Sequence, residues 1–120
     1  MARRPRRVLV VDDNVDAASS LRRVLEMSGH EVREAHDGLE ALEASAAFHP
    51  EVVLLDIGMP RMDGYQAAQE LRRRHLNGAL RIVAVTGWGQ EEDRRRALAA
   101  GFDAHLTKPI ELTQLEALLA

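Results

Sequence analysis

The sequence predicts an α/β fold with a doubly wound, five-stranded parallel sheet. Short β-like runs alternate strictly with helix-like stretches along the 120 residues, which is typical of consecutive βαβ units. The runs at 7–11, 51–55 and 81–85 are almost continuously apolar, as expected of strands buried on both faces. The runs at 31–35 and 103–107 alternate or are weakly apolar and suit the edges. This pattern allows the strand order 2-1-3-4-5.

Capping signals place the helices of the first half. Asn14 is a good N-cap for a helix that runs to Ser28, and Gly29 ends it. A second helix is expected over 37–48, with Asp37 as its cap. Each helix therefore begins just after a predicted strand.

The helices of the second half carry charge signals at their ends. A helix over about 63–74 closes with three arginines, which are favourable at the negative end of its dipole. A helix over 90–100 has acidic residues in its first turn and Gly101 just past its end. A last helix is expected to start near Ile110 and to run into the C-terminus.

Length and composition limit the class of protein. One compact domain suits 120 residues, and 46 % apolar with 29 % charged residues is an ordinary soluble composition. The absence of cysteine excludes disulfides, thiolate catalysis and cysteine-based zinc sites. A formal charge of −3 does not attract nucleic acid or an anionic membrane. We therefore expect neither nucleic-acid binding nor membrane insertion. No apolar run suits a membrane span or signal peptide, and we expect a cytoplasmic chain.

Residues with polar side chains follow the predicted strands at the point where each strand ends. Asp12 and Asp13 come after the first strand and Asp56 after the third. Thr86 follows the fourth strand and Lys108 the fifth. Ligands of open parallel sheets bind outside the carboxyl ends of the strands, at the switch point that this order places between the first and third strands. We therefore expect these five residues to share one site.

Three carboxylates at one spot require a cation. At about 4 Å and an effective dielectric near 20, each like-charge pair costs on the order of 4 kcal/mol. Oxygen ligands with open positions favour Mg²⁺. Ordinary turn or cap roles would explain one such acid, but they do not explain three with a hydroxyl and a lysine. Asp56 follows a predicted central strand, so we expect it to be the best held and the least solvated of the three, and an aspartate can attack phosphorus to form an acyl phosphate.

Four motifs, in this order and spacing, carry a resemblance to a known family: VLVVDDN (8–14), LLDIGMPRMDGY (54–65), AVTG (84–87) and LTKP (106–109). The chain resembles the receiver domain of two-component response regulators over essentially its whole length. The resemblance implies a flavodoxin-like (βα)5 receiver domain over 7–120 and leaves 1–6 as an N-terminal tail or linker. The stretch 86–110 is similar to receivers that are fused to hybrid sensor histidine kinases.

The resemblance implies a phosphoryl-transfer and metal site. Asp56 would be the phosphoacceptor, and the phosphodonor would be a histidine kinase or a histidine phosphotransfer protein. Asp13 and Asp56 would bind Mg²⁺, or Mn²⁺ in its place, with Asp12 acting mainly through water. The backbone carbonyl of Gly58 would complete the protein ligands. Such a domain catalyses only its own phosphorylation and dephosphorylation.

The resemblance also implies residues that respond to the phosphoryl group. Thr86 would be the switch hydroxyl, and Lys108 would pair first with Asp56 and then with the phosphoryl group. The bond before Pro109 is usually cis in the family, and cis bonds are essentially confined to proline. In many relatives the fourth helix, fifth strand and fifth helix form the surface for an output partner.

Two residues depart from the family pattern or extend it. His105 stands where the family usually has a Tyr or Phe that follows the switch threonine. It is either an ordinary edge-strand residue or a conformational switch that is weakened or made sensitive to pH. Trp88, the only tryptophan, is either a surface-loop aromatic or a residue that shapes access to the phosphorylation site.

Two rival functions remain open from the sequence. A Mg²⁺-dependent phosphatase with an aspartyl nucleophile after its first strand usually needs a D-x-D pair and a longer chain, whereas this chain has VDDN. A degenerate receiver that only binds partners normally lacks one of the acidic or lysine positions, and here all are present.

Overall fold

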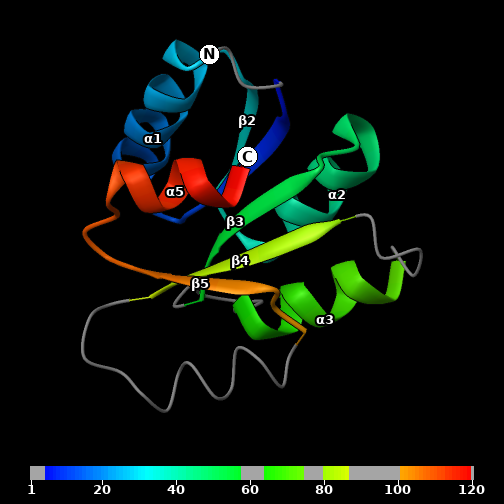
Figure 1. Ribbon diagram of the computed structural model, residues 1–120. Helices are drawn as coiled ribbons and strands as arrows, with labels where there is room; N and C mark the ends of the chain where they lie inside the picture. The colour runs from blue at the N-terminus through cyan, green and yellow to red at the C-terminus, as the bar shows by residue number, and fades with distance from the viewer. Residues whose placement is uncertain (1–4, 58–63, 75–79, 87–100, 120) are drawn as a thin grey trace.

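A five-stranded parallel sheet forms the centre of the computed structural model, which describes residues 5–57, 64–74, 80–86 and 101–119. The strand order is β2-β1-β3-β4-β5, which confirms the order predicted from the apolar patterns (Figure 1). The strands are β1 (Arg7–Val11), β2 (Glu31–Ala35), β3 (Val52–Asp56), β4 (Arg81–Thr86) and β5 (Ala104–Thr107). β2 and β5 occupy the two edges, as their weaker apolar patterns predict.

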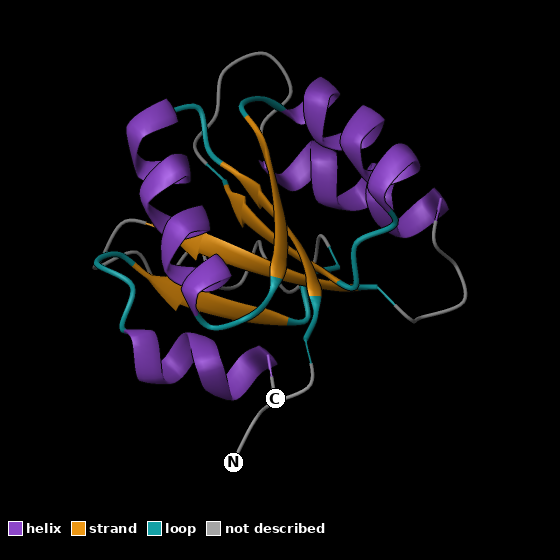
Figure 2. Cartoon of the chain, turned by 90° about the horizontal axis from the view of Figure 1, so that it is seen from above, coloured by secondary structure: helices purple, strands orange, loops and turns teal. Residues whose placement is uncertain are grey.

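Helices cover both faces of the sheet, as the doubly wound class requires (Figure 2). One face carries α1 (Val15–Met27) and α5 (Leu112–Leu119). The other face carries α2 (Gly38–Phe48) and α3 (Gly64–Arg74). The helix expected over 90–100 lies outside the described residues. None of the described helices has both the length and the apolar character needed to cross a membrane.

The apolar side chains of each strand divide between two cores. Along β1, Val8 and Val10 join the core under α1 and α5, whereas Leu9 and Val11 join the core under α2 and α3. This division follows from the period of two along a strand. All four side chains are almost fully buried, so β1 is held rigidly on both faces up to the point where Asp12 follows.

The predicted helix caps form with the expected partners. The Asn14 side chain accepts a 3.1 Å hydrogen bond from the Ala17 amide, and the Asp37 side chain accepts a 2.8 Å bond from the Glu40 amide. Gly29 follows the end of α1 with φ of 96°, a conformation that glycine adopts readily. These caps place the start of α1 two residues beyond Asp13.

Several element ends differ from the sequence prediction, among them β4, which runs to Thr86 rather than ending at residue 85. β3 runs one residue further and includes Asp56, which pairs with Val85 in β4. β5 begins at Ala104 rather than one residue earlier. α5 begins at Leu112 rather than near Ile110, because Ile110 instead packs partly buried against the core under α1 and α5.

Arg6, which the sequence assigns to an N-terminal tail, is tied to the fold. Its amide donates to Nδ1 of the buried His30 at 3.0 Å. Its guanidinium donates to the Leu119 carbonyl at 3.0 Å and to Glu51 at 3.1 Å. The sequence pattern misses this because all three partners are distant in the chain. Arg6 thus connects the starts of β2 and β3 to the end of α5.

Arg72 makes a second long-range connection, between α3 and the starts of β4 and β5. Its guanidinium donates to the carbonyls of Leu80 at 2.8 Å and Gly101 at 3.0 Å. It also pairs with Asp103 at 2.6 Å, and the same Asp103 oxygen accepts the Ile82 amide at 2.7 Å. One side chain therefore satisfies three acceptors on two segments, one before β4 and one before β5.

We expect Arg72→Ala to lower the free energy of unfolding by about 1–3 kcal/mol, because it removes the donor to the partly buried carbonyls of Leu80 and Gly101. Arg73→Ala is the matched control, since Arg73 is 70 % exposed and forms its ion pair with Glu70 of the same helix. It should change the free energy by no more than about 0.5 kcal/mol. Urea denaturation measures both. Equal losses would show that Arg72 acts as an ordinary surface residue.

Candidate functional site

The carboxyl ends of β1, β3 and β5 bring charged side chains together at one edge of the sheet. Asp12 and Asp13 follow β1, Asp56 ends β3, and Lys108 follows β5. Carboxylate oxygens of the three aspartates all lie within 4.8 Å of one another. The structure thus places the three acids at the switch point between β1 and β3.

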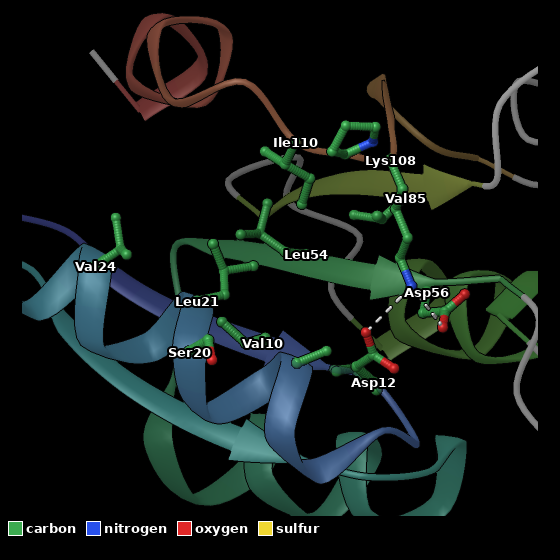
Figure 3. A pocket seen from close by; sticks show the side chains of 13 residues that line it. Val10, Asp12, Ser20, Leu21, Val24, Leu54, Asp56, Val85, Lys108 and Ile110 are labelled. Atoms are coloured by element: carbon green, nitrogen blue, oxygen red, sulfur yellow. Dashed lines mark hydrogen bonds and ion pairs between the residues drawn. The ribbon is translucent and has the colours of Figure 1, made fainter.

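Lys108 lies between two of the carboxylates (Figure 3). Its Nζ is 3.3 Å from Oδ2 of Asp12 and 3.4 Å from Oδ2 of Asp56. Burial by itself would lower the pKa of Lys108, but the charges of Asp56 and Asp12 outweigh burial and the net shift is upward. Lys108 therefore keeps its charge at neutral pH. Its contribution to folding is complete below the ordinary lysine pKa of about 10.4 and is lost as the pH rises through the raised value.

Asp12 is held on its other side by the residue that begins α1. Oδ1 of Asp12 accepts the Asn14 amide at 2.9 Å, while the Asn14 side chain caps α1. Asn14 therefore links the orientation of a site carboxylate to the start of a helix. The sequence pattern predicts the cap but not this second role; an Asp with an Asn two residues later is the local signal for this turn.

Asp56 is not the least solvated of the three acids, which corrects the expectation from its central strand. The Asp12 side chain is 11 % exposed and that of Asp56 is 16 % exposed. Both carboxylates contact Lys108, and Asp12 also accepts the Asn14 amide, a contact that strand position alone does not reveal. Asp13 is exposed and completes the cluster from the solvent side.

The donor set fits a hard divalent cation. Three carboxylates with one ammonium leave the cluster with a formal charge of −2. Carboxylate oxygens are the protein ligands that Mg²⁺ and Mn²⁺ prefer, and Mg²⁺ keeps several waters in such open sites. Asp12, Asp13 and Asp56 are therefore the described residues that could hold the ion.

The remaining predicted residues are only partly within the described structure. Thr86 ends β4 and pairs with Thr107, but its side chain lies outside the description, as do Gly58 and Trp88. His105 is half-buried in β5. The Lys108–Pro109 bond is cis.

The fold and this cluster agree with the family comparisons. The model of the response regulator receiver domain matches residues 8–120. The chain therefore belongs to the family of response regulator receiver domains. Response regulator MprA of Mycobacterium ulcerans (strain Agy99) is 41 % identical over 109 residues, which cover 91 % of this chain and 46 % of that protein. The chain thus spans about half the length of the curated relatives that it matches.

Solved structures show the same architecture. Chemotaxis protein CheY4 of Vibrio cholerae superposes with a TM-score of 0.88 at 28 % identity, and the match covers 97 % of each chain. NtrX of Brucella abortus superposes with a TM-score of 0.88 at 31 % identity. The match covers 97 % of this chain but only 26 % of the longer NtrX chain. The fold therefore occurs both as a domain-sized chain and as part of larger proteins.

The charge of the cluster predicts opposite effects of Asp13→Asn with and without metal. In metal-free buffer we expect it to raise the free energy of unfolding by about 0.5–1 kcal/mol, because it relieves repulsion at an exposed position. Saturating Mg²⁺, at about 100 times its Kd, should stabilise the wild type by about 2.7 kcal/mol and the variant much less. Denaturation with EDTA and with Mg²⁺ measures both effects.

Asp16→Asn is the control for that comparison, because Asp16 is exposed in the first turn of α1 and is not part of the cluster. It removes a charge that is favourable at a helix N-terminus, so it should destabilise the metal-free protein slightly. Its gain from Mg²⁺ should equal that of the wild type. An equal gain in Asp13→Asn would exclude Asp13 as a ligand.

Proposed function

We propose that the chain accepts a phosphoryl group from a phosphohistidine on Asp56, in a reaction that depends on Mg²⁺. The observation that carries the proposal is the cluster itself: three carboxylates within 4.8 Å and an ammonium 3.4 Å from Asp56. Family membership supports the same reaction class. The donor would be a histidine kinase or a histidine phosphotransfer protein in the cytoplasm.

The reaction needs a nucleophile and groups that neutralise charge on phosphorus. A carboxylate oxygen of Asp56 forms the new bond to phosphorus while the bond from phosphorus to the donor's imidazole nitrogen breaks. The imidazole leaves with the electron pair of that bond. Bound Mg²⁺ would supply charge neutralisation to the phosphoryl oxygens. Asp12 and Asp13 would hold the ion, and Lys108, 3.4 Å from Asp56, would add a second positive charge.

Lys108 would also transmit the effect of phosphorylation to the rest of the fold. It contacts Asp12 and Asp56 before the reaction, and the phosphoryl oxygens would offer it new acceptors. Thr86, at the end of β4, would bind the same group through its hydroxyl. His105 in β5 would then act as the conformational switch, and Trp88 would shape access to the site. The switch would shift a balance between two conformations and control a partner or an attached kinase module.

The output partner would bind to the surface whose conformation changes on phosphorylation. In this proposal β5 and α5 form part of that surface, together with the expected fourth helix. MprA and NtrX are longer than this chain, so an output could depend on parts of a protein that this domain does not include.

Acetyl phosphate with Mg²⁺ should add one phosphoryl group to the wild type and none to Asp56→Asn. The substitution keeps the size of the side chain but removes the nucleophilic oxygen charge. Intact-mass spectrometry measures the gain, and Asp16→Asn is the control with the same change of charge. A phosphoryl group retained by Asp56→Asn would place the acceptor elsewhere.

Lys108→Arg should keep phosphorylation of Asp56 but weaken the conformational response. Lys108 is the only lysine among 16 lysine and arginine residues, and arginine is a planar fork rather than a compact ammonium. Fluorescence of Trp88, the only tryptophan, measures the response to phosphorylation. Lys108→Met tests the loss of charge in parallel. A full response in Lys108→Arg would mean that any cation serves.

A further inference from the structure

A cavity of about 330 Å³ opens beside the carboxylate cluster, between α1 and the loop that joins β5 to α5 (Figure 3). Leu21 and Val24 of α1 form one wall, and Ile110 of the loop forms the other. Leu21 and Ile110 are partly buried and Val24 is 37 % exposed, so the apolar walls reach the surface. The cavity can therefore be entered from solvent.

The floor of the cavity is apolar and rigid. Val10, Leu54 and Val85 supply it from the neighbouring strands β1, β3 and β4. Their exposed fractions are 2 %, 1 % and 4 %, and they belong to the core under α1 and α5. A firm apolar floor favours an aromatic or alkyl group over a polar one.

The charged side chains at one end of the cavity give that end a net negative charge. Asp12 and Asp56 line this end together with Lys108, and Asp13 lies in the same cluster. Three carboxylates outnumber the one ammonium, so the metal-free cluster attracts a cation and opposes an anion. The cavity thus joins an apolar body to an end that selects positive charge.

We propose that this cavity binds a small cationic amphiphile, a molecule with an aromatic or alkyl body and a primary ammonium that lies among the carboxylates. The size is suitable: a cavity of about 150 Å³ holds benzene, so 330 Å³ accommodates a phenyl ring with a short aminoalkyl chain. The ammonium occupies the position that Mg²⁺ takes in the proposed function. Amine and metal therefore exclude each other, and the amine holds the site in its unphosphorylated form.

Only the exclusion of Mg²⁺ rests on the proposed function, and binding of the amine does not. The first experiment is therefore done in EDTA, with 2-phenylethylamine as ligand and amide chemical shifts as readout. The comparison ligands are 2-phenylethanol, which lacks the charge, and ethylamine, which lacks the ring. The amine should bind at least about tenfold more tightly than either. Equal affinity for 2-phenylethanol, or no binding of the amine, would overturn the proposal.

Variants of two exposed helix residues locate the ligand. Ser20→Phe places a ring at the α1 wall of the cavity and should weaken binding of 2-phenylethylamine by about tenfold or more. Ala46→Phe adds a similar ring to α2, on the opposite face of the sheet, and should leave the affinity unchanged. Thermal melting checks that both variants fold. Unchanged affinity in Ser20→Phe would place the ligand outside this cavity.

Titration of the amine at increasing Mg²⁺ tests the overlap of the two sites. The apparent Kd of the amine should rise in proportion to Mg²⁺ once the metal exceeds its own Kd. An apparent Kd that stays constant while Mg²⁺ shifts the amide signals of Asp12 and Asp13 would overturn the proposed position of the ammonium. Tight amine binding by a protein that acetyl phosphate fails to phosphorylate would contradict the proposed function and leave this inference standing.

Discussion

Repulsion among three carboxylates at one sheet edge is the constraint on which the rest of the site depends. Their oxygens lie within 4.8 Å of one another, and each pair at that spacing costs on the order of 3 kcal/mol at an effective dielectric near 20. Lys108 offsets part of this cost by contacting Asp12 and Asp56. The sheet holds this arrangement in place, and a bound divalent cation would relieve the repulsion that remains.

The sheet can hold this cluster because its central strands are fixed on both faces. Residues of β1 alternate between the two cores with almost no exposure, so the position at which Asp12 follows has little freedom. The amide of Asn14 then orients the carboxylate while its side chain fixes the start of α1. Packing far from the solvent thus determines the separation of charges at the surface.

Sequence patterns predict this arrangement as far as it depends on periodicity. Parallel strands end at one edge, so the acids after β1 and at the end of β3 had to converge, and the apolar patterns identified the edge strands. The contacts of Arg6 with Leu119 and of Arg72 with Gly101 were not predictable, because they join single side chains to carbonyls far along the chain. The predicted order of burial of Asp12 and Asp56 was wrong for the same reason, because the burial of each side chain depends on the groups that contact it.

Charge balance also connects the acidic cluster to the apolar cavity beside it. In the proposed reaction a carboxylate with one negative charge becomes an acyl phosphate with about two at neutral pH. The pull on the Lys108 ammonium then increases, and Lys108 with Pro109 and Ile110 forms the wall of the cavity opposite α1. A stronger pull on that wall would change the shape of the cavity, whereas a cation bound in the cavity would weaken the pull. If both proposals hold, the state of Asp56 and the occupancy of the cavity would be coupled through one loop, and by linkage each would influence the other equally.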